Sequence, residues 1–100
     1  MMTAHAIVTV AEMTVYGQSF GQIALRLGVS RSVVSGIVQR AKILAKDFSR
    51  NRRPAVDAVA DWMAEFGGSV EACAAAIGSS ERDVAKIWAA ILLSLGWQAR

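Results

Sequence analysis

Four side chains that could read DNA bases are spaced along one face of a helix in the sequence SRSVVSGIVQR (residues 30–40). Arg31, Ser32, Ser35 and Gln39 recur at intervals of three and four residues, the spacing of neighbours on a helix surface. Arginine can bond guanine bidentately and glutamine can bond adenine in the same way, whereas serine discriminates less. We therefore expect these four residues to contact bases, the alternative being an ordinary solvated helix face.

Two helical runs around a short break would hold these side chains in place. The apolar residues from Phe20 to Leu27 have helical spacing, and those from Val34 onward have it again. Gly28 suits the left-handed residue that ends a helix, and Ser30 is a favourable N-cap for the next one. The pattern predicts a helix-turn-helix, whose second helix commonly lies in the DNA major groove.

The whole chain has an all-α pattern. Its 100 residues are 54% apolar and include one proline and eight glycines, without β-branched runs framed by hairpin turns. We predict helices at about 3–16, 19–27, 30–48, 54–66, 69–77 and 80–95. Residues 3–10 (TAHAIVTV) are the one place where a strand could be argued.

The pattern of the first half recurs in the second at an offset of 50 residues. Tyr16-Gly17 recurs as Phe66-Gly67, Leu27-Gly28 as Ile77-Gly78, and the serines and core valines between them follow. We predict two tandem three-helix helix-turn-helix units, residues 1–49 and 50–100, packed as one small helical domain. The alternative is chance similarity between amphipathic helices.

Charge differs sharply between the two halves. Residues 1–53 carry eight basic and two acidic side chains, whereas residues 54–100 carry three basic and six acidic ones. A basic first half suits a polyanion, so this unit is expected to read DNA. The expected phosphate contacts are Gln18, Ser19, Gln22, Arg26, Ser30, Arg40, Lys42, Lys46, Arg50, Arg52 and Arg53.

The second unit is expected to serve packing and oligomerisation. On its last helix the places of the base-reading face hold Ser80, Glu81, Arg82, Ala85, Ala89 and Ala90, which we expect outside. Acidic residues there would face phosphates unfavourably, so strong DNA contact is not expected. The apolar surplus of Trp88, Leu92, Leu93 and Trp97 must be covered by the first unit or by another copy of the chain.

The sequence offers little for catalysis. The single Cys73 matches Ile23 in the repeat and suits a buried apolar position, and His5 has no catalytic partner at a recognisable spacing. No metal-ligand cluster or glycine-rich phosphate loop occurs, so neither enzyme activity nor a cofactor or metal is expected. Without a signal peptide or membrane span in the sequence, we expect a cytoplasmic, nucleoid-associated protein.

Residues 19–40 resemble the prokaryotic and phage helix-turn-helix proteins that include transposase and resolvase DNA-binding domains and sigma-factor region 4. Within that group, the segment RSVVSGIVQR is similar to the recognition helix of the GcrA family of alphaproteobacterial cell-cycle regulators. That helix has an Arg, a Val, a Gly, a Val and a final Arg where this chain has Arg31, Val34, Gly36, Val38 and Arg40. The family usually has His where Gln39 stands, and it lacks an evident second unit.

Together these patterns predict a sequence-specific, double-stranded DNA-binding transcriptional regulator, bacterial or phage in origin. A homodimer is expected because one short recognition helix reads few base pairs, and the transcription machinery is a further expected partner. One alternative is a small terminase subunit or recombination accessory protein. Another is a protein-interaction module that docks a partner such as RNA polymerase.

Overall fold

The computed structural model describes residues 3–50, 54–67 and 69–98 of the chain. Within these ranges the chain forms no strand, so the all-α prediction is confirmed and residues 4–10 belong to a helix. The six helices are α1 (Ala4–Val15), α2 (Phe20–Leu27), α3 (Arg31–Arg50), α4 (Pro54–Phe66), α5 (Val70–Ile77) and α6 (Glu81–Gln98). Arg52 and Arg53 lie outside the described residues, as do the side chains of Arg50 and Trp97.

Side-chain caps and left-handed glycines fix where the helices begin and end. The hydroxyl of Thr3 accepts a hydrogen bond from the amide of Ala6 at 3.2 Å, which caps the first turn of α1. After α1 the chain turns at Gly17, whose φ of +90° is unfavourable for a residue with a side chain. These local signals are readable in the sequence, which is why the predicted boundaries lie within a few residues of those observed.

The second half of the chain repeats the helix positions of the first. Helices α4, α5 and α6 each begin 50 residues after α1, α2 and α3. Ser19 and Ser69 are both N-caps, and Gly28 and Gly78 end α2 and α5 with φ of 68° and 71°. The offset seen in the sequence therefore corresponds to matched helix starts, and for α2 and α5 to matched caps at both ends.

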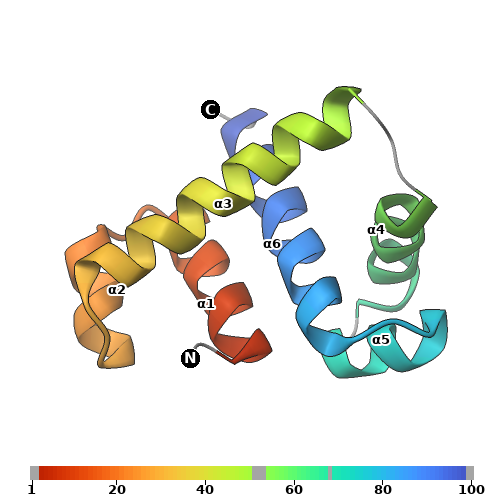
Figure 1. The fold of residues 1–100 in the computed structure, drawn as a ribbon, viewed down its shortest axis with the longest axis horizontal. Helices are drawn as coiled ribbons and strands as arrows, with labels where there is room; N and C mark the ends of the chain where they lie inside the picture. Colours follow the sequence, from red (N-terminus) through yellow and green to blue (C-terminus); the bar gives the residue numbers. More distant parts are fainter. Residues whose placement is uncertain (1–2, 51–53, 68, 99–100) are drawn as a thin grey trace.

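Helix α6 lies between helices α1–α3 on one side and helices α4 and α5 on the other, and it contributes to both hydrophobic clusters (Figure 1). The larger cluster, here the first cluster, joins buried residues of α1, α2 and α3 to Ala85, Ala89 and Leu93 of α6. The smaller, second cluster joins residues of α4 and α5 to Val84 of α6. The most extensive contact between two helices is that of α1 with α6. Opposite sides of one helix thus complete two cores.

The outward position expected for three alanines of α6 is wrong. Ala85, Ala89 and Ala90 are fully buried, and the first two belong to the first cluster. Alanines let two helix backbones approach closely, so this side of α6 can pack directly against α1 and α3. Among the apolar residues beside them, Leu93 is buried in the first cluster and Leu92 packs against it, whereas Trp88 packs against both clusters.

Candidate nucleic-acid interface

Helix α2 and the turn that leads to α3 are fixed by three short-range features. Ser19 and Gln22 form a capping box, in which the Gln22 amide donates to Ser19 Oγ at 3.2 Å and the Ser19 amide donates to Gln22 Oε1 at 3.0 Å. Gly28 ends α2 in the left-handed conformation. Ser30 Oγ then accepts from the amide of Val33 at 3.3 Å, which caps the start of α3 after a connection of three residues, 28–30.

The four residues predicted to contact bases line one shallow surface concavity of about 500 Å³. We call it the reading concavity, and its lining consists of Phe20, Arg31, Ser32, Ser35, Gly36 and Gln39. Arg31, Ser32 and Gln39 are exposed, and Ser35 is half-buried. The side chains that share a face in the sequence are therefore presented together, beside the first turn of α2.

Helix α3 is anchored in the first cluster through the side opposite the reading concavity. Val34 and Val38 are buried in the first cluster, and Ala41 continues the same stripe one turn later. The polar stripe that starts in the reading concavity extends beyond it to Lys42 and Lys46, since these residues follow Ser35 and Gln39 after two helical turns. Helix α3 thus presents a continuous polar and basic line to one side of the molecule.

The expected phosphate contacts fall into two groups. Arg26 in the last turn of α2 is exposed, as is Lys46, whereas Gln18 and Lys42 are half-buried. Ser19, Gln22 and Ser30 use their side chains to cap helices. At the start of α2 the amides of Phe20 and Gly21 have no carbonyl four residues earlier in the helix to which they could donate. These two N–H groups are therefore the donors that a phosphate could use there.

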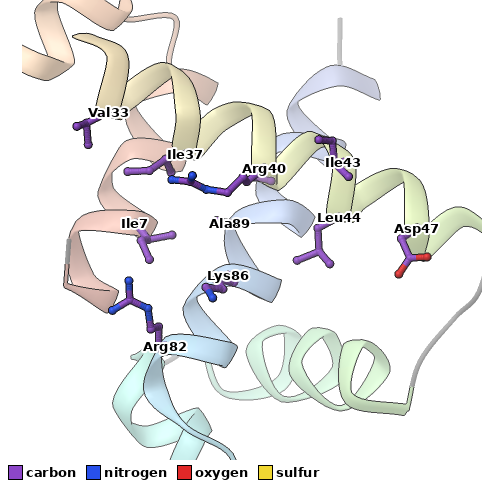
Figure 2. A pocket seen from close by; sticks show the side chains of 11 residues that line it. Ile7, Val33, Ile37, Arg40, Ile43, Leu44, Asp47, Arg82, Lys86 and Ala89 are labelled. Atoms are coloured by element: carbon purple, nitrogen blue, oxygen red, sulfur yellow. The ribbon is translucent and has the colours of Figure 1, made fainter. Parts of the chain in front are cut away.

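Arg40 lies away from the polar stripe. It lines a second, larger hollow on another side of α3, and its guanidinium folds back over Gly36 (Figure 2). A Cβ built on Gly36 would lie 3.6 Å from Arg40 Nη2. Because Gly36 also lines the reading concavity, Arg40 marks the border between the two hollows.

The face of α6 that corresponds to the reading concavity of α3 is not exposed as a whole. The offset of 50 residues matches Ser35 and Gln39 of α3 with Ala85 and Ala89 of α6, and both alanines are fully buried against the first half. Glu81 and Arg82, at the places of Arg31 and Ser32, are exposed. Only α3 therefore presents the whole face to solvent.

The sequence did not indicate every residue of these surfaces. Phe20 was expected only in the core, yet it borders the reading concavity while packing against the first cluster. The larger hollow also includes Val33 and Ile43, whose side chains are 38% and 67% exposed. Their signal in the sequence is that they are apolar but fall outside the buried stripe of α3.

Cys73 is fully buried in the second cluster. Burial raises the pKa of its thiol above the ordinary value, because the thiolate would be poorly solvated. Among the described residues, no three His, Cys, Asp or Glu side chains come together as a metal site. None of the described helices combines the length and apolar character needed to cross a membrane.

Comparison with known proteins gave no match to a protein family, to a curated protein or to a solved structure. The resemblance of residues 19–40 to helix-turn-helix proteins therefore stays a prediction from the sequence.

Proposed function

We propose that the chain is a sequence-specific, double-stranded DNA-binding transcriptional regulator that reads bases with α3. The observation that carries this proposal is the reading concavity, which gathers Arg31, Ser32, Ser35 and Gln39 on one exposed surface. Side chains in the first two turns of a recognition helix are those that reach base edges in the major groove. Four convergent polar side chains on a helix anchored by its opposite face suit this task.

The basic residues around the concavity support the same proposal. Arg26 lies at the end of α2, and Lys42 and Lys46 continue the polar stripe along α3. Cations on both sides of a recognition surface would hold the phosphates of the two strands and fix the helix in the groove. Arg40 lies over Gly36 at the border of the concavity, where its guanidinium would serve a phosphate beside this surface.

We further infer that the chain consists of two tandem helix-turn-helix units in which only the first reads DNA. The matched helix starts, serine caps and left-handed glycines support the tandem arrangement. The burial of Ala85 and Ala89 supports the inference that only the first unit reads DNA. The face of α6 that would contact bases in the second unit is covered by helices of the first unit.

Assembly as a homodimer on a two-fold symmetric site is part of the proposal. One recognition helix of this length contacts few base pairs, and pairing two copies doubles the contacts. The transcription machinery is the proposed partner for regulation, and the nucleoid of the cytoplasm is the proposed location. A terminase or recombination role and a pure protein-docking role would use the same α2–α3 surface.

Selection of duplexes from a random pool, followed by titration against salt, tests the proposal. We expect an enriched motif, and a plot of log K against log salt whose slope is about −0.9 per phosphate contacted. Two-fold symmetry in the motif would support the dimer. Salt-sensitive binding without a motif would contradict sequence-specific regulation and favour a packaging role. Absence of duplex binding, with a retained protein partner, would favour the docking role.

A further inference from the structure

A half-open groove of about 780 Å³ lies beneath α3, where α1 and α6 meet it (Figure 2). Its floor is apolar and comes from all three helices, with Ile7 of α1, Ile37 and Leu44 of α3, and Ala89 of α6. Pockets of roughly 300–1,000 Å³ with apolar linings and a few convergent polar groups are typical of small-ligand sites. The groove has the size and the lining of such a site.

The charged residues of the groove are unevenly placed. Arg40, Arg82 and Lys86 line it together with a single acid, Asp47. In Figure 2 the guanidinium groups of Arg40 and Arg82 lie toward the Ile7 end, whereas Asp47 lies at the far end of the visible part of α3. A ligand with one anionic end and an apolar body would match both the cationic end and the apolar floor.

We propose that this groove binds a small carboxylic acid with an apolar body. The carboxylate would lie among Arg40, Arg82 and Lys86, and the body would run over Leu44 toward Ile43. Charge complementarity favours this occupant, because three cations and a single acid line the groove and their combined field attracts an anionic group. The same argument disfavours a cationic amphiphile.

Binding at this site would alter the DNA-reading surface through Arg40. The guanidinium of Arg40 lies over Gly36, which lines the reading concavity on the other side. A carboxylate in the groove would hold that guanidinium away from any DNA phosphate, so ligand and duplex would weaken each other's binding by the same factor. This regulatory consequence rests on the proposed DNA binding, whereas occupancy of the groove does not.

Calorimetric titration of the full chain with decanoate tests the site without DNA. Decylammonium and decan-1-ol are the matched probes with the same apolar body. We expect saturable binding of one decanoate per chain and at least tenfold weaker binding of the other two. Lys86→Glu should weaken decanoate binding at least tenfold, and Arg26→Glu, which reverses an exposed charge outside the groove, should leave it unchanged.

A second titration, of labelled duplex with and without decanoate, separates this proposal from the proposed function. Selective decanoate binding to a chain that binds no duplex would support the site while overturning DNA recognition. Duplex binding with no decanoate binding would overturn the site alone. Equal binding of the three probes, or decanoate binding insensitive to Lys86→Glu, would overturn it as well. So would self-association through the groove, detected as a concentration-dependent dimer that Ile43→Glu dissociates while no probe binds.

Discussion

The guanidinium of Arg40 lies across Gly36, one turn earlier on α3, with Nη2 3.6 Å and Nη1 3.8 Å from the position that a Cβ would take. Both distances are ordinary van der Waals separations, so the arginine does not require a glycine there. Glycine within a helix costs about 1 kcal/mol relative to alanine. The proposed contact with DNA would offer a reason for this cost, since Gly36 lines the reading concavity.

Gly36→Ala should therefore raise the stability of the fold while it lowers the affinity for DNA. We expect the free energy of unfolding to rise by up to about 1 kcal/mol, because the helix gains propensity without a steric conflict. Duplex affinity should fall, because the added methyl group would lie at the edge of the reading concavity, against the Arg40 guanidinium, and would keep that edge from approaching DNA closely. Urea denaturation measures the first effect and fluorescence anisotropy with the selected duplex measures the second. Unchanged affinity would show that Gly36 does not lie against DNA.

Arg31→Ala should weaken binding to the selected duplex at least tenfold, about 1.4 kcal/mol. Arg31 is exposed in the first turn of α3 and lines the reading concavity. Arg82→Ala is the matched control in the first turn of α6, and we expect it to change affinity little. Anisotropy titrations of both variants at one salt concentration provide the comparison. Similar losses for the two variants would mean that both halves touch DNA.

Leucine substitutions on the buried side of α6 and on the exposed face of α3 should differ in their effect on stability. Ala85→Leu forces extra atoms between α6 and the first half, away from the groove, and should cost about 1–3 kcal/mol. Gln39→Leu adds an apolar side chain at an exposed place and should stay within about 0.5 kcal/mol of the wild type. Urea unfolding monitored by circular dichroism measures both. A neutral Ala85→Leu would contradict the tight packing of α6 against the first cluster.

Cys73 should make stability depend on pH in the alkaline range. Burial raises the pKa of its thiol in the folded chain above the ordinary value of 9.0. From about pH 8 to about pH 10 the unfolded chain loses the thiol proton while the folded chain keeps it, so the free energy of unfolding falls as pH rises. The stabilising contribution is complete below the unfolded pKa.

Cys73→Ala removes this titration, so the decline with pH should be shallower in the variant than in the wild type. Urea unfolding at several pH values checks the difference in slope, which is independent of the overall stability lost by truncating a buried side chain. Parallel curves for the two proteins would show that the thiol does not govern the dependence. Slow alkylation of the native protein by iodoacetamide would be a second sign of its burial.

The helix positions were predictable because their signals are local. Thr3, Ser19 and Ser30 cap helices through bonds to residues three positions away, and Gly28 needs only its own backbone conformation. The same holds for the polar face of α3, since periodicity alone puts its residues on one side. Such local signals can be recognised in the sequence without knowledge of the tertiary fold.

The buried face of α6 was not predictable in this way. The helix is apolar on more than one side, so periodicity does not say that Ala85 and Ala89 are buried while Arg82 is exposed. That outcome depends on α1 and α3, which are distant in sequence. The groove escaped prediction for the same reason, because its floor joins Ile7 to Leu44 and Ala89 and exists only after the halves have packed.

The double role of α6 has a consequence for folding. Val84 completes the core of the second half, and Ala85, the next residue, completes that of the first. A repeated sequence would ordinarily suggest two modules that melt separately. Here neither module can close its interior without the same helix, so we expect a single cooperative unfolding transition for the whole chain.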